Sequence, residues 1–331
     1  MNRLDCRAKI PVCRLLVPAV AVLVWLAAGT RVLPAEMHPD QDERGFYIGL
    51  TGFRDQISNL DFSLTTSTSG GEGLRLRLDR GGELRYDVGW LLPESQGSVS
   101  ITYWEFVETQ EGEKSTVPLL NLQATSFVIY DPSGPPIGRS AVEARVEILA
   151  RSVDISYSRD FKSAENFRAT WMLGLRWFRY EHRMQSTYFT GAGATLADIA
   201  IEEVESTGVG PRLGAFFQYD FTRGWGLAGG LGVATLFGDT DQGNVSASRI
   251  ATPSELISFS ETRNQSRTFT QVDLDLHVLY RPGWRTLDLR AGFRYSHWFD
   301  ARARELLGAG DSFQNERVTF DGPYLRVGYR F

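Results

Sequence analysis

Apolar and polar residues alternate strictly over the last eight residues of the chain, from Tyr324 to Phe331. A period of two predicts a β-strand with one apolar and one polar face. The same pattern recurs along most of the chain, in the segments Gly45–Phe53, Leu84–Leu92, Ser98–Phe106, Arg145–Phe161, Phe167–Tyr188, Val209–Phe221, Trp225–Phe237, Gln271–Arg281 and Leu287–Tyr295, and the last strand begins near Val318. The sequence therefore predicts about ten strands. Eight or twelve are the alternatives, because residues 72–80 alternate as well.

The connections between these segments follow a rule of their own. Short joins fall at residues 93–97, 162–166, 222–224 and 282–284, and long joins at 54–83, 108–144, 189–208, 238–270 and 296–317. Long and short joins alternate along the whole chain, as they do in outer-membrane barrels, which have short periplasmic turns and long extracellular loops. We therefore expect an all-β, transmembrane, antiparallel up-and-down β-barrel. A soluble sandwich or lipocalin-like barrel is the alternative, but it has no reason to alternate its loops.

Aromatic residues gather near the ends of the predicted strands, which is typical of interfacial belts. One group lies near the short turns (Trp90, Phe221, Trp225, Tyr280, Trp284, Tyr329 and Phe331), and the other lies near the long loops (Trp104, Trp177, Phe237, Tyr295 and Trp298). The terminal pair Tyr329 and Phe331 also resembles the C-terminal signal of bacterial outer-membrane barrels. That resemblance implies outer-membrane lipid, the barrel-assembly machinery and periplasmic chaperones as partners.

The first 35 residues have the pattern of a secretory signal peptide. A basic region that ends at Arg14 precedes an uncharged stretch of 16 residues, which is shorter than the roughly 18 that a spanning helix needs. We expect cleavage between about residues 29 and 36, a barrel over residues 36–331 and a location in the cell outer membrane. An uncleaved anchor is the alternative. Cys6 and Cys13 both lie in this leader, so the mature chain has no disulfide and no thiolate site.

Charge and histidine content narrow the chemistry. Residues 1–35 carry five basic and one acidic residue, so their removal takes the net charge from −5 to −9. An acidic chain of this kind argues against a nucleic-acid partner. The four histidines (His38, His182, His277 and His297) are scattered, so no metal site and no cofactor are expected.

The polar faces of the predicted strands would line the barrel interior. They collect arginines and aspartates in nearly equal number: Arg85, Arg176, Arg212, Arg290, Arg294, Arg326 and Arg330, with Asp87, Asp154, Asp160, Asp220, Asp273, Asp275 and Asp288. One interpretation is a charged constriction that filters small solutes. The other is a network of ion pairs that fills a narrow barrel, since eight strands are just filled by side chains. Small residues at Gly226, Ala228, Gly230, Gly232 and Ala234 leave room for water or an inward loop.

One motif raises an enzymatic alternative. Asp275-Leu276-His277 places a carboxylate and an imidazole on one face of a strand, and it resembles the Asp-x-His pairing of the omptin proteases. Omptins also need a second acidic pair on the facing wall, for which Asp87 and Asp154 are the nearest candidates, but each is single. We therefore expect no enzymatic activity, and an ion network explains His277 more simply.

Four short stretches carry a family resemblance: Val153–Tyr157, Gly174–Tyr180, Gly208–Gly214 and Gly292–Tyr295. Their order and spacing over roughly residues 84–331 resemble the pore-forming major outer membrane proteins, the MOMP-like porins. The resemblance implies a passive pore or an abundant surface barrel, with no catalytic residues to carry over. We therefore expect a porin-like passive channel for small solutes, and a non-conducting structural or surface-interaction barrel as the alternative.

Overall fold

The structure is a computed structural model that describes residues 45–58, 61–63, 65–67, 75–77, 80–93, 97–115, 122–124, 141–164, 166–190, 195–222, 224–249, 256–282, 286–305 and 313–331. The regular structure in these ranges is β-strand: β1 Gly45–Ser58, β2 Asp61–Ser63, β3 Thr65–Ser67, β4 Arg75–Arg77, β5 Arg80–Leu91, β6 Ser98–Ser115, β7 Leu122–Ala124, β8 Ala141–Ala164, β9 Phe167–Thr190, β10 Thr195–Thr222, β11 Trp225–Arg249, β12 Leu256–Tyr280, β13 Leu287–Glu305 and β14 Phe313–Arg330. The described ranges contain no helix that is long and apolar enough to cross a membrane. The expected signal peptide, residues 1–35, lies outside the described residues.

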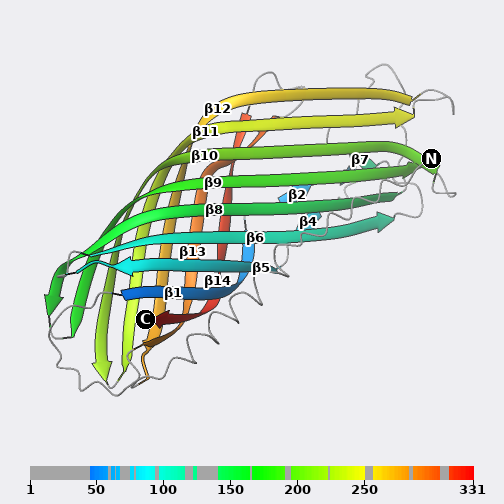
Figure 1. The fold of residues 1–331 in the computed structure, drawn as a ribbon. Helices are drawn as coiled ribbons and strands as arrows, with labels where there is room; N and C mark the ends of the chain where they lie inside the picture. The colour runs from blue at the N-terminus through cyan, green and yellow to red at the C-terminus, as the bar shows by residue number, and fades with distance from the viewer. Residues whose placement is uncertain are drawn as a thin grey trace. The chain divides into compact units, whose positions relative to one another are not determined.

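Ten of the described strands form one closed antiparallel barrel, in the order β1-β14-β13-β12-β11-β10-β9-β8-β6-β5. The last strand closes against the first, because Tyr47 of β1 pairs with Arg330 of β14 and Phe53 pairs with Tyr324. On its other side β1 pairs with β5. In Figure 1, β12, β11, β10, β9, β8, β6, β5 and β1 lie side by side in this order. The predicted ten-stranded up-and-down barrel is confirmed.

The alternating segment at residues 72–80 does not add a strand to the barrel. Its described part, β4, pairs with β2 in a separate two-stranded sheet. The short strands β3 and β7 form another small sheet. All four of these strands lie in the connections between β1 and β5 and between β6 and β8, so the alternative of twelve barrel strands is excluded for the described residues.

Large apolar side chains cover a belt on the outward face of the barrel. On β9 the outward residues Trp171, Leu173, Leu175 and Trp177 are all exposed. The neighbouring strands add Ile155, Val209, Leu213, Phe217, Tyr219, Phe221, Trp225, Leu227, Leu231, Val233, Phe237, Leu274, Leu276, Val278, Phe293, Leu325 and Val327. A soluble protein rarely exposes an apolar patch of more than a few hundred Å². The belt is the lipid-facing band of a membrane barrel, and the alternation places it.

Five strands continue far beyond this belt. Strands β8 to β12 are 24 to 28 residues long, whereas about 9 to 11 residues cross a membrane. Past Trp177 the outward side chains of β9 become charged, and Arg179 and Arg183 pair with Glu205 and Glu203 of β10 at 3.0 and 3.1 Å. These strands project out of the membrane at the end opposite the short turns.

The projecting strands correct the predicted loops. The intervals 189–208 and 238–270 are mostly strand, and the connections shrink to residues 191–194 and 250–255. The interval 108–144 likewise loses its two ends to β6 and β8. The apolar half of the alternation stops where the strands leave the lipid, because an outward side chain that faces water need not be apolar. Apolar residues lie on the inward face there, as Ala144, Val146, Ile148 and Ala150 do on β8, so the apolar positions change from odd to even where this strand leaves the lipid.

The half of the lumen nearer the projecting strands is packed with apolar side chains. Its members come from β6, β8, β9, β11, β12, β13 and β14: Trp104, Phe106, Ala144, Val146, Ile148, Ala150, Phe178, Tyr180, Met184, Ala234, Leu236, Phe269, Trp298, Val318 and Phe320. Trp104 and Trp298 were expected in the outer aromatic belt, and that expectation is wrong, since both are inward and at most 3% exposed. Trp104 lies two positions after inward Thr102, and Trp298 two positions after inward Ser296, so the period of two places both rings inside the barrel.

Candidate functional site: the barrel lumen

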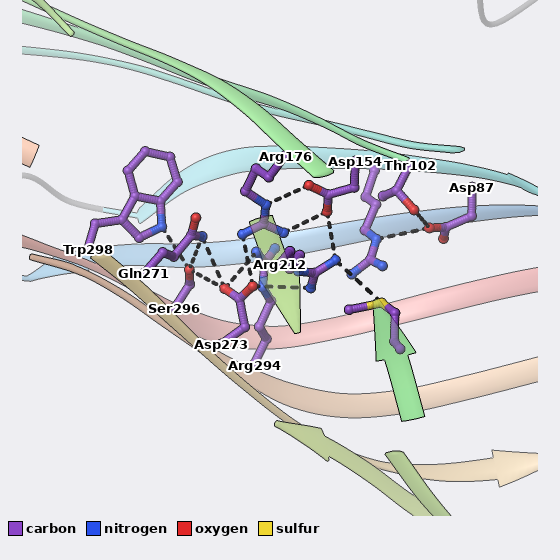
Figure 2. A network of polar contacts seen from close by, with 12 residues as sticks. Asp87, Thr102, Asp154, Arg176, Arg212, Gln271, Asp273, Arg294, Ser296 and Trp298 are labelled. Atoms are coloured by element: carbon purple, nitrogen blue, oxygen red, sulfur yellow. Dashed lines mark hydrogen bonds and ion pairs between the residues drawn. The ribbon is translucent and has the colours of Figure 1, made fainter. Parts of the chain in front are cut away.

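A layer of buried ion pairs crosses the lumen beneath the aromatic cluster. Arg176 of β9 binds Asp154 of β8 through two bonds, with Nε 2.5 Å from Oδ1 and Nη2 2.6 Å from Oδ2. Its remaining Nη1 donates across the barrel to Asp273 of β12 at 2.9 Å. Figure 2 shows these side chains meeting in the interior. A two-pronged arginine–carboxylate pair fixes geometry as well as charge.

A second arginine joins the same two carboxylates. Arg212 of β10 donates to Asp154 at 2.8 Å and to Asp273 at 3.2 Å. Arg176 and Arg212 are both almost fully buried, so each needs its carboxylate partners. Charges taken out of water are tolerated only when they are well paired and hydrogen-bonded. The two arginines and two aspartates form a closed four-residue network.

Strand β13 and strand β5 extend the layer to the other wall. Arg294 of β13 donates to Glu83 of β5 at 2.6 Å, and the Glu83 side chain is fully buried. The guanidinium carbon of Arg294 also lies 5.4 Å from the ring centroids of Phe53 and Trp104. Ser296, which donates to Asp273 at 2.7 Å, accepts a hydrogen bond from the indole of Trp298. The charged layer is thus joined to the aromatic cluster above it.

The aromatic cluster itself bridges opposite walls. The rings of Phe178 on β9 and Trp298 on β13 have centroids 5.2 Å apart, although three strands separate β9 from β13 in the barrel order. Trp298 also contacts Trp104 of β6 at 5.5 Å and Phe320 of β14 at 5.2 Å. Edge-to-face and tilted contacts at such distances are favourable. The cluster therefore spans the lumen among the described side chains.

Below the ion-pair layer, towards the short turns, two further aspartates each form ion pairs with two arginines. Asp87 lies 3.1 Å from Arg85 and 3.3 Å from Arg326, and it accepts a hydrogen bond from Thr102 at 2.8 Å. Asp288 lies 2.6 Å from Arg290 and 3.7 Å from Arg281. This end of the lumen is hollow, with a cavity of about 320 Å³.

A model of the Legionella pneumophila major outer membrane protein precursor family matches residues 99–331. The chain belongs to the Legionella major outer membrane protein family. The match covers β6 to β14, which include eight of the ten barrel strands. The family and the barrel together establish an outer-membrane β-barrel, and the resemblance to major outer membrane proteins is confirmed.

Solved structures that resemble this family member are outer-membrane barrels of distant sequence. The outer membrane protease OmpT from Escherichia coli is 14% identical, with 90% of this chain and 99% of that one covered at a TM-score of 0.44. The translocator domain of the autotransporter NalP from Neisseria meningitidis is 13% identical, with 97% of each chain covered and a TM-score of 0.38. A major outer membrane protein from Thermus thermophilus is 14% identical, with coverages of 87% and 99% and a TM-score of 0.34. No curated protein matches the chain.

The residues predicted to line the lumen of this family member all lie on the inward-facing parity of their strands. The structure joins Arg85, Asp87 and Arg326 in one cluster, Asp154, Arg176, Arg212, Asp273 and Arg294 in another, and Asp288 and Arg290 in a third. Asp160 and Asp220 lie apart from these, near the short turns, where they accept hydrogen bonds from Thr170 and Gln218. Arg330 lines the cavity at the same end.

Sequence reasoning missed two members of the clusters. Glu83, the partner of Arg294, falls in the predicted join 54–83, because the predicted strand begins at Leu84 whereas β5 begins at Arg80. Glu83 lies two and four positions before Arg85 and Asp87, which face inward, so the period of two along the strand indicates that Glu83 faces inward as well. Arg281 follows the last residue of β12 and pairs with Asp288.

Two side chains occupy part of the room expected beside the small residues of β11, while Ala228 lines the cavity at the short-turn end. A methyl group added at Gly230 would collide with the ring of Phe216, its partner on β10. One added at Gly232 would meet the guanidinium of Arg212 at 3.4 Å. The small residues of β11 therefore accommodate neighbouring side chains, whereas water or an inward loop was expected there.

The Asp275–His277 pair exists but is engaged in a structural network. His277 Nδ1 lies 2.5 Å from Asp275 Oδ1, and the hydroxyl of Tyr324 on β14 donates to the same oxygen at 2.8 Å. Asp87 and Asp154, the nearest candidates for a second acidic pair, are held by arginines of the two separate clusters. The described residues contain no group of three or more histidine, cysteine, aspartate or glutamate side chains that could hold a metal ion.

Proposed function

We propose that this outer-membrane barrel is a non-conducting, rigid surface barrel. The observation that carries the proposal is the contact between Phe178 and Trp298, which spans the lumen above a layer of ion pairs that also spans it. A passive channel needs a continuous aqueous path along the barrel axis. Two successive layers of side chains in mutual contact, one apolar and one charged, oppose such a path.

The projecting strands support a role at the cell surface. They extend the barrel wall beyond the lipid belt and present an outward face of alternating charges, as in Arg145 with Glu111 and Glu147, and Arg183 with Glu203. Exposed pairs of this kind contribute little stability, about 0 to 1 kcal/mol each. Their regular spacing on strands that also bury apolar residues inward favours a stiff extension of the barrel wall.

The experiment is a planar bilayer recording of the purified, folded barrel. Folding is first checked by heat-modifiable migration in a gel, and a conventional porin is inserted in a parallel membrane as a positive control. We expect a silent bilayer for the wild-type chain. Discrete conductance steps from the folded wild-type protein would contradict the proposal and favour the porin-like channel.

The porin-like channel for small solutes remains the second candidate. The specific observation in its favour is the hollow short-turn end of the lumen, where the cavity of about 320 Å³ lies beside arginines and serines. In that case the ion-pair layer would have to rearrange to admit a solute. Conductance that appears only above a threshold voltage would favour this candidate.

We propose a structural role for Asp275 and His277. Asp275 accepts from both His277 and Tyr324, which ties β12 to β14 across the inner face of β13. Asp275→Asn and His277→Ala are expected to change unfolding behaviour without removing any peptidase activity. A peptide-cleaving activity in the wild-type barrel that either substitution abolishes would overturn this assignment and establish the omptin-like alternative.

A further inference from the structure

The cavity at the short-turn end of the lumen is built by the whole barrel. Its lining includes residues from each of the ten barrel strands, from Tyr47 on β1 to Arg326 on β14. Outer-membrane barrels keep their short turns on the periplasmic side. The volume of about 320 Å³ is at the lower end of the range for small-molecule pockets. The size admits a small solute from the periplasm and not a polymer.

The charge of the cavity is unbalanced. Among its described lining residues, seven are arginines and two are aspartates. Asp87 is shared by Arg85 and Arg326, and Asp288 is shared by Arg290 and Arg281. Asp220 is linked to Arg281 as well, through Gln218, which donates to Asp220 and accepts from Arg281. Arginines nevertheless outnumber aspartates in the lining, and they lie in a partly enclosed space where electrostatic attraction is stronger than in water.

Hydroxyl groups face the arginines from the opposite wall. Ser98 and Ser100 on β6, Ser156 and Ser158 on β8 and Thr170 on β9 line the cavity. In the barrel order these strands lie across from β13 and β14, which carry Arg290 and Arg326. Guanidinium groups and hydroxyls that converge on one space are the donors that bind phosphate oxygens.

Four buried polar atoms of the residues that line this cavity have no hydrogen-bond partner among the described residues: Oδ2 of Asp87, Nε of Arg326, Nε2 of His277 and Nε of Arg212. Oδ2 of Asp87 lies 3.3 Å from Nη2 of Arg326 as an ion pair. His277 and Arg212 are 8% and 7% exposed. Nδ1 of His277 is already bonded to Asp275, so the ring is held with Nε2 directed elsewhere. The Nε–H of Arg212 can donate to a ligand oxygen, whereas Nε2 of a neutral His277, whose Nδ1–H donates to Asp275, can accept from a ligand hydroxyl.

From these observations we propose that the cavity binds a small phosphate-bearing solute from the periplasmic side. The arginine pairs on Asp87 and Asp288 hold the phosphate group, and the serine wall of β6 and β8 accepts its polar remainder. The site ends at Arg212, whose guanidinium belongs to the ion-pair layer, so binding does not require passage through the barrel. The proposal is therefore independent of whether the barrel conducts.

The test is calorimetric titration of the folded full chain in a neutral detergent and a phosphate-free buffer. The probes are inorganic phosphate, glucose 6-phosphate and a short-chain phosphatidylglycerol below its micelle concentration. We expect glucose 6-phosphate to bind, and Arg290→Gln and Arg326→Gln each to weaken its affinity at least ten-fold. Arg183→Gln is the matched control, because Arg183 is an outward arginine on the projecting part of β9, where it pairs with Glu203 of β10; its affinity should equal that of the wild type.

The outcomes separate the sources of phosphate. Binding of phosphatidylglycerol alone, weakened by the same two substitutions, would support the site and identify a lipid headgroup as its ligand. If the buried variants fail to fold, Arg168→Gln replaces them, because the Arg168 side chain is about half exposed and its substitution should leave the barrel folded. We expect Arg168→Gln to weaken binding several-fold. Absence of binding by all three probes, or equal weakening by Arg183→Gln, would overturn the proposal.

Discussion

Glu83 and Arg294 are 211 positions apart in the chain, and the oxygen and nitrogen of their buried ion pair are 2.6 Å apart. Closure of the barrel is what brings them together, because β1 and β14 lie between β5 and β13 in the barrel order. The pair belongs to a charged layer that also contains Arg176, Arg212 and Asp273. The layer and the aromatic cluster above it both span the lumen, so substitutions in either one test the proposed non-conducting barrel.

Removal of Asp154 should strongly destabilise the barrel. Asp154→Ala leaves Arg176 and Arg212 with only Asp273 as a shared partner, and breaking a buried pair on one side costs about 3 to 5 kcal/mol. The free energy of unfolding in urea, measured for the detergent-folded barrel, checks the value. Glu203→Ala is the matched control, because it breaks the exposed pair with Arg183 and should cost about 1 kcal/mol or less. Equal losses for the two variants would show that the layer is not a stabilising network.

Truncation of the aromatic cluster should open the lumen. Trp298→Ala and Phe320→Ala each remove a large buried ring and are expected to cost about 3 to 5 kcal/mol. The double variant should produce transient conductance in a planar bilayer where the wild type is silent. Trp90→Ala and Trp225→Ala, which remove rings from the outward face, form the control pair and should leave the bilayer silent. A silent double variant that still folds would mean that the ion-pair layer closes the barrel by itself.

The glycines of β11 should differ sharply in their tolerance of a methyl group. Gly230→Ala forces the added carbon into the ring of Phe216, and overpacking of this kind costs about 1 to 3 kcal/mol. Gly243→Ala on the same strand meets nothing within 4 Å and should leave the unfolding midpoint unchanged or raise it slightly. Rescue of Gly230→Ala by Phe216→Leu would confirm that the ring is the cause. Equal midpoints for the two alanine variants would argue against this packing.

The last residue should matter more for assembly than for the finished barrel. Phe331 donates its backbone N–H to the carbonyl of Phe46 at 2.8 Å, and its ring packs on Tyr329 with centroids 4.9 Å apart. Phe331→Ala keeps the backbone bond, so the purified chain should refold in detergent with nearly unchanged stability. In cells, however, we expect the folded, heat-modifiable fraction to fall several-fold. Substitution of Phe161, an exposed ring near another short turn, is the control. A normal folded fraction for Phe331→Ala would remove the case for an assembly signal.

Much of the fold was predictable because it depends on a local rule. An alternation of two along a strand specifies which side chains face lipid, and the outward belt from Trp171 to Trp177 follows it without exception. The ten barrel strands and the short turns were predicted for the same reason. The projecting halves of β8 and β9 also fall largely within the predicted segments Arg145–Phe161 and Phe167–Tyr188. Those of β10, β11 and β12 were not predicted, since their outward residues face water and need not be apolar.

The sequence alone determined that this chain is a barrel, which face of each strand looks inward, and that the interior is crowded with arginine and aspartate. Only the tertiary structure decided what these residues do to one another. The partner of Arg294 is Glu83 and the partner of Phe178 is Trp298, and neither pairing has a signal within its own strand. Contacts across a lumen depend on strand order, stagger and closure, which are properties of the whole ring. The period of two along each strand is enough to place Trp104 and Trp298 inside the barrel. The contact between the two rings depends on closure of the barrel.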